Sequence, residues 1–183
     1  MAERPLRADA ARNRQRVLDA ARAAFAEGGP GVSLDDIAAR AGVGPGTVYR
    51  HFPSKEALFA AVAEARVRDV VADARSRADQ PDPAAAFDGF LDRLAAEAIA
   101  KRDLPEVLTG AGSAEVRAAA DELRAALAVL LARAQEVGAI RADVTAAEVS
   151  ALVGGLVRAT LDGPDTAPAG RLLQIVRDGL RPR

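Results

Sequence analysis

Several residue types that carry chemistry are missing or rare in this chain. Among its 183 residues there are no cysteines and no tryptophans, and there is one histidine. The absence of cysteine excludes thiol nucleophiles, disulfides and cysteine-rich metal sites, and one histidine leaves at most one imidazole for acid–base catalysis. The acidic residues form no cluster with metal-ligand spacing. We therefore expect neither an enzyme nor a protein that holds a metal or a cofactor.

Long apolar segments are also missing. The longest uncharged stretch near the C-terminus, 149–157, is much shorter than the roughly 18 apolar residues that a membrane span requires. Arginines interrupt the first thirty residues, which therefore lack the continuous apolar region of a secretory signal. The sequence predicts a cytoplasmic protein that makes no contact with a membrane.

Charge is balanced overall but unevenly distributed. The chain has 25 basic and 26 acidic residues, a net charge of −1, which excludes a protein that binds nucleic acid through bulk charge. Residues 1–55 contain nine basic and six acidic residues, a net charge of +3, whereas residues 56–183 contain sixteen and twenty, a net charge of −4. Any contact with nucleic acid would therefore be local and near the N-terminus.

The abundant residues favour helix. Alanine occupies 45 positions and arginine 23, and both are strong helix formers. Apolar spacing and the glycine and proline breaks predict helices at about 8–27, 34–42, 47–52, 55–77, 84–101, 104–108, 113–137, 145–161 and 168–180. We expect an all-α fold of about nine helices.

Local signals mark several helix ends. Ser33 and Asp36 have the spacing of a capping box, and so do Thr145 and Glu148. Gly42 follows an apolar helical pattern at a position where a left-handed residue would end the helix. These signals predict a short helix between Ser33 and Gly42 and a new helix after Thr145.

The segment from 33 to 55 has the pattern of a helix-turn-helix. Ala38 is small enough to let two helices approach each other, and Gly42 can adopt the conformation of the turn. Val43 and Val48 would fill the space between the helices. The second helix could then enter the major groove of DNA.

The segment Leu34–Leu58, LDDIAARAGVGPGTVYRHFPSKEAL, resembles the DNA-binding signature of the tetracycline-repressor (TetR) family of transcriptional regulators. The resemblance implies a three-helix, helix-turn-helix DNA-binding domain at residues 1–54, with a flexible basic arm at 1–8. It also implies a larger helical domain for effector binding and dimerisation at 55–183, in which a helix at 55–79 links the two domains. Members of the family are typically homodimeric repressors that leave their operator when a small molecule enters the second domain.

The expected DNA-binding residues are Ser33, Pro45, Gly46, Thr47, Tyr49, Arg50, His51 and Lys55. Tyr49, His51 and Lys55 fall on positions that approach DNA phosphates in the family. The positions where the recognition helix meets base edges are Pro45, Gly46, Thr47 and Tyr49. Lys55, one of two lysines, stands at a helix N-terminus, where the helix dipole disfavours a cation, so a phosphate contact explains it better than helix stability does. Two alternatives stay open at this point: His51 could pack beside Phe52, and Tyr49 could be a core aromatic residue.

Base readout by the second helix would be sparse. Pro45 and Gly46 offer no side-chain hydrogen bonds to bases, which leaves Thr47 and Arg50 to contact base edges. Further specificity could come from DNA shape, or from an N-terminal arm that places Arg4, Arg7, Arg12 and Arg14 in a minor groove. The alternative for that arm is a solvated tail.

The larger domain carries an apolar stripe that either lines an effector cavity or forms ordinary core. Its members are Phe87, Phe90, Leu94, Leu108, Leu127, Leu130 and Leu131. Arg93 and Glu97, beside this stripe, could orient a ligand or form a surface ion pair. The pattern assigns no ligand-binding residue.

The helix expected at 145–161 is apolar on all sides and contains Gly154 and Gly155. Such a helix is buried on more than one side. It could face its own domain on one side and a second subunit on the other, with Leu156 in the apolar seam. We therefore expect a homodimer through the helices at about 145–161 and 168–180, and the alternative is a central helix in a monomer.

These patterns favour a ligand-responsive, DNA-binding homodimer that represses transcription at a double-stranded operator until a small molecule of unknown identity releases it. Two other functions stay open: a constitutive or architectural DNA-binding dimer without an effector, and a helical protein-interaction adaptor. An adaptor would explain the amphipathic helices, but it would not explain Gly42 at the turn or the segment Tyr49–Lys55.

Overall fold

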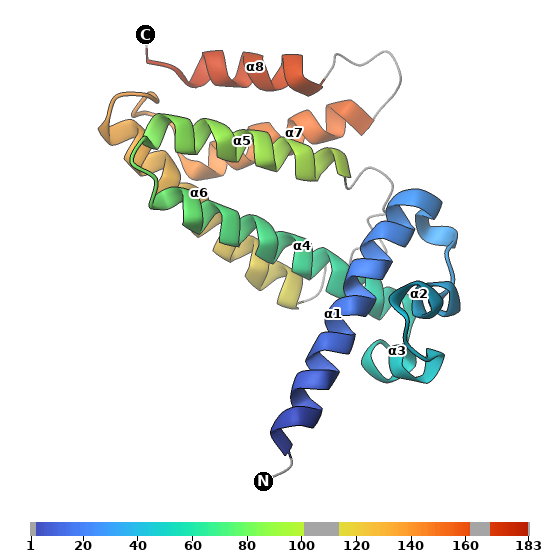
Figure 1. Ribbon diagram of the computed structural model, residues 1–183. Coiled ribbons are helices and arrows are strands. Elements are labelled where there is room, and N and C mark those ends of the chain that lie inside the picture. Colours follow the sequence, from blue (N-terminus) through green and yellow to red (C-terminus); the bar gives the residue numbers. More distant parts are fainter. Residues whose placement is uncertain (1–2, 101–113, 162–168, 183) are drawn as a thin grey trace. The chain divides into compact units, whose positions relative to one another are not determined.

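The computed structural model describes residues 3–100, 114–161 and 169–182. In these ranges the chain forms eight α-helices and one short 3₁₀ segment and contains no strand, so the expected all-α fold is confirmed (Figure 1). The helix expected at 104–108 lies outside the described residues. The described residues form two compact units: the first unit contains 3–65 and 114–116, and the second contains 66–100, 117–161 and 169–182.

The helices of the first unit are α1 (Glu3–Gly28), α2 (Leu34–Ala41), α3 (Pro45–His51) and the first part of α4 (Lys55–Ala78). Helices α1, α2 and α3 contact one another. Helix α1 begins at Glu3 rather than near Ala8, so residues 3–8 of the expected flexible arm are helical. Pro5 does not prevent this, because it lies in the first turn, where its missing N–H would have no partner within the helix.

Local signals around the turn are confirmed. The Ser33 hydroxyl accepts a hydrogen bond from the Asp36 amide at 3.1 Å, and the Asp36 carboxylate accepts one from the Ser33 amide at 3.3 Å. Gly42 ends α2 in the left-handed conformation, with φ of 63°. Helix α3 begins at Pro45, slightly before the expected Thr47, because proline is favoured at the first helical position.

The core of the first unit joins its four helices. The rings of Phe25 and Phe59 stack with their centroids 4.0 Å apart. Ala38 and Val48 are fully buried, and Val43 packs against the same core, as the helix-turn-helix pattern predicts. Val48 is the buried residue of α3. Val48 is thus the one fully buried anchor of this helix, and its exposed residues, Pro45, Gly46, Tyr49 and Arg50, are available for contacts outside the unit.

The second unit contains the rest of α4 together with α5 (Pro83–Ala100), α6 (Ala114–Glu136, from residue 117), α7 (Ala146–Leu161) and α8 (Ala169–Leu180). Helix α5 contacts α7 and α8, and α7 contacts α8, so the three lie side by side (Figure 1). Of the predicted stripe, Phe87, Phe90, Leu127, Leu130 and Leu131 are buried in one core cluster, and Leu94 packs against it. Leu108 lies outside the described residues. The described part of the stripe is thus core.

Helix ends in the second unit also follow local chemistry. Asp82 caps α5 by accepting hydrogen bonds from the amides of Ala84 and Ala85, both at 3.0 Å. The expected capping box before α7 is confirmed, because the Glu148 carboxylate accepts from the Thr145 amide at 2.8 Å and the Thr145 hydroxyl accepts from the Glu148 amide at 3.3 Å.

The charged pair of α5 is less exposed than a surface ion pair. Arg93 Nη1 lies 3.0 Å from Glu97 Oε2, and the Glu97 side chain is only 14% exposed. Arg66 of α4 approaches the other carboxylate oxygen, at 3.9 Å. Glu97 therefore connects α4 to α5 in addition to pairing along its own helix.

Candidate DNA-binding surface

The turn between α2 and α3 is held by both local and distant contacts. The amide of Val43 donates to the carbonyl of Ala38 at 3.1 Å, which closes the end of α2. Arg16 of α1 donates from Nη2 to the carbonyl oxygen of Gly42 at 3.3 Å. A Cβ atom on residue 42 would lie 2.7 Å from this nitrogen. Glycine is therefore required by its backbone conformation, and its small size also leaves room for the arginine.

Helix α3 presents polar side chains on its exposed surface. Tyr49 is 48% exposed, so it is not a core aromatic residue. Pro45, Gly46 and Arg50 are exposed, and Thr47 is half-buried. Arg50 makes no hydrogen bond or ion pair with any other residue that the structure describes. Its guanidinium is thus available to an external acceptor.

The end of α3 is packed against an aromatic ring. Phe52 is buried, and the His51 ring lies 6.3 Å from it between centroids, at an interplanar angle of 53°. The guanidinium of Arg14 lies 5.4 Å from the Phe52 ring centroid, within the range of a cation–π interaction. His51 therefore packs beside Phe52, yet it stays half-buried, with surface left for a further contact.

The side chains of Lys55 and Ser33 differ in whether their polar groups already have partners within the protein. Lys55 is the first residue of α4, is half-buried, and has no ion pair within the described ranges. The Ser33 hydroxyl donates to the Asp36 carboxylate at 2.6 Å in addition to accepting from its amide. The hydrogen bonds that the Asp36 carboxylate accepts from the Ser33 hydroxyl and amide hold its pKa below the usual value of 3.8. The observed role of the Ser33 side chain is thus to cap α2.

Three arginines are committed to contacts within the unit: Arg14, which the sequence offered as part of a minor-groove arm, and Arg16 and Arg40, which it did not assign to DNA. Arg14 and Arg16 hold Phe52 and Gly42, as described above. Arg40 binds both carboxylate oxygens of Glu27, at 2.6 and 2.5 Å, and its hydrogen bonds lower the pKa of Glu27. No fixed sequence spacing marks such contacts. Among the described side chains of α3 and the start of α4, Arg50 and Lys55 have no ion pair and are available to an anionic partner, whereas Arg14, Arg16 and Arg40 are used in contacts within the unit.

Two other kinds of site are not found in the described parts of the chain. No group of three or more His, Asp or Glu residues among them could hold a metal ion. None of the helices in those ranges is long and apolar enough to cross a membrane. The surface around α3 combines cationic and hydrogen-bonding side chains. Such a surface suits a nucleic acid, whose phosphates are anionic and whose bases form hydrogen bonds.

Two family models match this chain. The model described as bacterial regulatory proteins, tetR family, matches residues 17–62, which include α2, the turn and α3. The model described as transcriptional regulator SbtR-like, C-terminal domain, matches residues 82–182. The chain belongs to the TetR family of transcriptional regulators. TetR-family regulators are DNA-binding transcription factors, which confirms both the resemblance and the expectation that the chain is not an enzyme.

Individual TetR-family proteins agree with this assignment. A solved TetR transcription regulatory protein from Mycobacterium vanbaalenii is 43% identical, over 97% of this chain and 100% of that one, with a TM-score of 0.78. The uncharacterized HTH-type transcriptional regulator TtgW of Pseudomonas putida is 47% identical over 60 residues, which are 32% of this chain and 45% of the relative. The HTH-type transcriptional repressor LfrR of Mycolicibacterium smegmatis is 44% identical over 68 residues, 37% of this chain and 35% of the relative. Each curated match spans less than half of the relative's length.

Proposed function

We propose that this TetR-family regulator is a homodimeric repressor, which binds a double-stranded operator through α2, the turn and α3 and leaves it when a small molecule binds the second unit. The observation that carries the proposal is that α3 is held by a buried residue while its arginine stays exposed. Val48 anchors the helix, while Arg50 is exposed without a polar partner among the described residues. The partial similarity to LfrR, which is described as a repressor, supports the direction of regulation.

The proposal divides the exposed residues into two groups. Thr47 and Arg50 are the side chains that would contact base edges, and Pro45 and Gly46 are small enough to let the backbone approach the groove. The second group would contact phosphates and fix the register of the protein on the duplex. Its members are Tyr49, His51 and Lys55. Ser33 would contribute indirectly, by fixing the first turn of α2, because its hydroxyl is already used in the cap.

The homodimer part of the proposal rests on an apolar groove between α7 and α8. Leu152 is 48% exposed and Ile175 is 53% exposed, and both line a groove of about 740 Å³. Gly155 lies in the same lining, and an added Cβ there would meet no described atom within 4 Å. A second copy of the chain could bring its own α7 and α8 to this groove around a two-fold axis. In both subunits, Leu152 and Ile175 would then be removed from contact with water.

The structure changes which residue of α7 best tests this interface. Leu156 is only 6% exposed and belongs to the core cluster of the second unit, although it also touches the groove. An arginine at 156 would therefore disrupt the monomer core, and loss of the dimer would not be a specific result. Leu152, on the exposed side of the same helix, separates the two effects.

Binding to DNA from beside the protein's own gene tests the proposal. Overlapping duplexes from that region would be titrated with the full chain, and binding would be followed by fluorescence anisotropy. We expect one duplex to be bound by a dimer far more tightly than the rest, with two half-sites about 34 Å apart, one turn of DNA. Equal, weak binding to every duplex would contradict operator recognition. A small-molecule screen on the bound operator complex then tests release, and failure of every compound would favour a constitutive dimer.

A further inference from the structure

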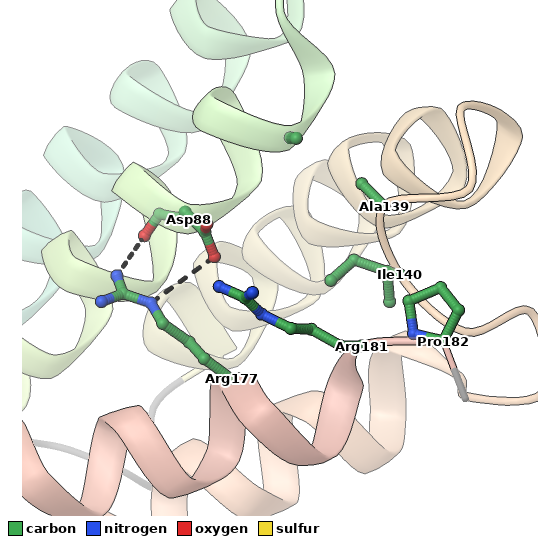
Figure 2. A pocket seen from close by; sticks show the side chains of 7 residues that line it. Asp88, Ala139, Ile140, Arg177, Arg181 and Pro182 are labelled. Carbon is green, nitrogen blue, oxygen red and sulfur yellow. Dashed lines mark hydrogen bonds and ion pairs between the residues drawn. The ribbon is translucent and has the colours of Figure 1, made fainter.

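A second cavity lies in the second unit, away from the groove between α7 and α8. It is bounded by α5, by α8 and by the turn between α6 and α7, and its volume is about 440 Å³ (Figure 2). Its wall is apolar at Ala139, Ile140 and Pro182, and it is charged at Asp88, Arg177 and Arg181. This volume lies within the usual range of small-molecule pockets, and a few polar groups on an apolar wall are the usual composition of such sites.

Arg177 is already neutralised by its neighbours. Its Nη2 lies 2.7 Å from Asp92 Oδ1 and donates to the carbonyl oxygen of Asp88, also at 2.7 Å. Its Nε lies 3.5 Å from Asp88 Oδ1. Figure 2 shows the side chain joined to Asp88 by both contacts. With its side chain only 18% exposed, Arg177 is fixed against α5 and holds α8 in place.

Arg181 is not committed in this way. It follows Leu180, the last residue of α8, and it makes no hydrogen bond or ion pair with any residue that the structure describes. In Figure 2 its guanidinium points into the space between Asp88 and Ile140. The cavity therefore contains a planar set of N–H donors, next to an apolar wall, with no acceptor from the described protein.

We infer that this cavity binds a small monocarboxylic acid with an apolar body, and that Arg181 is its anchor. A guanidinium binds a carboxylate through two parallel hydrogen bonds, which a neutral ligand cannot reproduce. The apolar part of the ligand would pack on Ile140 and Pro182. Asp88 lines the same cavity and would repel a second negative charge, which favours a monocarboxylate over a phosphate dianion. A role of this site in releasing DNA rests on the proposed function, whereas binding of the acid in the cavity does not.

Direct binding of two simple acids to the full chain tests the inference. Benzoate and hexanoate would be titrated by calorimetry, with benzamide and inorganic phosphate as the neutral and dianionic comparisons. We expect saturable binding of at least one acid and weaker binding of benzamide and phosphate. Arg181→Gln should weaken binding of the acid by about tenfold or more, because hydrogen bonds to charged groups have that effect on affinity. Arg181→Lys should retain part of the affinity.

Two further variants keep the test specific. Arg171→Gln removes an exposed arginine of α8 that does not line the cavity, and it should leave binding unchanged. Ala84→Phe should reduce binding by filling the cavity from α5. Binding of neither acid, tighter binding of phosphate, or equal binding by Arg181→Gln and the unsubstituted protein would each overturn the inference. Operator release is measured separately: an acid that binds without releasing DNA confirms the site and contradicts its role as the effector site.

Discussion

The exposed surface of α3 and the exposed groove between α7 and α8 differ in chemistry, although each lies on short helices whose buried side is apolar. The surface of α3 offers Thr47, Tyr49 and Arg50, while the groove offers Leu152 and Ile175. A surface with a free guanidinium suits an anionic partner, and its affinity falls as salt rises. An apolar groove suits another apolar surface, and salt weakens that contact little. The two surfaces should therefore respond differently to salt and to substitution.

The largest effect is expected from a charge placed in the groove. Ile175→Arg would bring two arginines together across a two-fold interface and bury each without a partner. We expect a monomer in sedimentation and a loss of operator affinity of about 100-fold or more, because each half-site is then bound separately. Val137→Arg changes a residue that is equally exposed, at 58%, but lies outside the groove lining, and it should remain a dimer. If the Ile175→Arg variant is still a dimer, the groove is not part of the dimer interface.

A substitution at the turn should affect the α3 surface without affecting the groove. Gly42→Ala forces a residue with a Cβ into a left-handed conformation, which costs about 1–2 kcal/mol, and it also displaces Arg16. We expect a lower Tm and weaker operator binding with an unchanged dimer in sedimentation. Gly31→Ala is the control, because its φ is not positive and its added Cβ has open space. Equal Tm values for the two variants would show that the turn tolerates the strain.

Loss of a base contact should change specificity. If Arg50 binds a base edge, Arg50→Ala costs about 1–3 kcal/mol at one base-pair position of the operator and little elsewhere. Anisotropy titrations with a set of single-base operator variants would measure this. The same loss on every operator variant would place Arg50 on the phosphate backbone.

Loss of a phosphate contact should have a smaller and more uniform effect. Lys55→Ala should weaken binding to cognate and unrelated duplexes by similar factors and reduce the slope of log affinity against log salt by about one. His51→Ala should act in the same direction. If both variants keep the affinity and the salt slope of the unsubstituted protein, neither side chain contacts a phosphate.

The smallest effect is expected at the cap of α2. Hydrogen bonds from the Ser33 hydroxyl and amide lower the pKa of Asp36, so the carboxylate stabilises the folded state above its unfolded pKa and stops doing so as pH falls through the folded pKa. Asp36→Asn should therefore lower Tm slightly at neutral pH, and this difference should shrink below about pH 4. Asp35→Asn, in the same turn but outside the capping box, is the matched control for removing one carboxylate. If the difference in Tm is the same at every pH, the charge of Asp36 does not contribute to the stability of the cap.

Features that depend on neighbouring residues were predictable from the sequence. The two capping boxes, the left-handed Gly42 and most helix ends require only a few consecutive side chains, and the structure has them. The expected start of α1 near Ala8 is wrong, because residues 3–8 are mostly helix formers and Pro5 is tolerated in the first turn.

Features that depend on distant residues could not be predicted. Arg16 and Gly42 are 26 residues apart, and the cavity of Arg181 combines residues from 84 to 182. Helical periodicity showed that α7 is apolar on all sides, but it could not show that Leu156 faces the core while Leu152 is exposed. That distinction depends on how α7 packs against α5 and α8. Local propensity thus predicted the elements, and tertiary packing determined which of their faces remain available.

Helix α8 contributes to both candidate ligand surfaces of the second unit. Leu172, Ile175 and Val176 line the groove, while Arg177 of α8 and Arg181, just past its end, line the smaller cavity. If a second subunit and an acid both bind, both contact the twelve-residue helix α8 or the residues directly after it. Thermodynamic linkage then requires reciprocity. If the acid changes the dimer dissociation constant by some factor, dimerisation changes the affinity for the acid by the same factor. If that factor differs from one, the occupancy of the cavity depends on protein concentration.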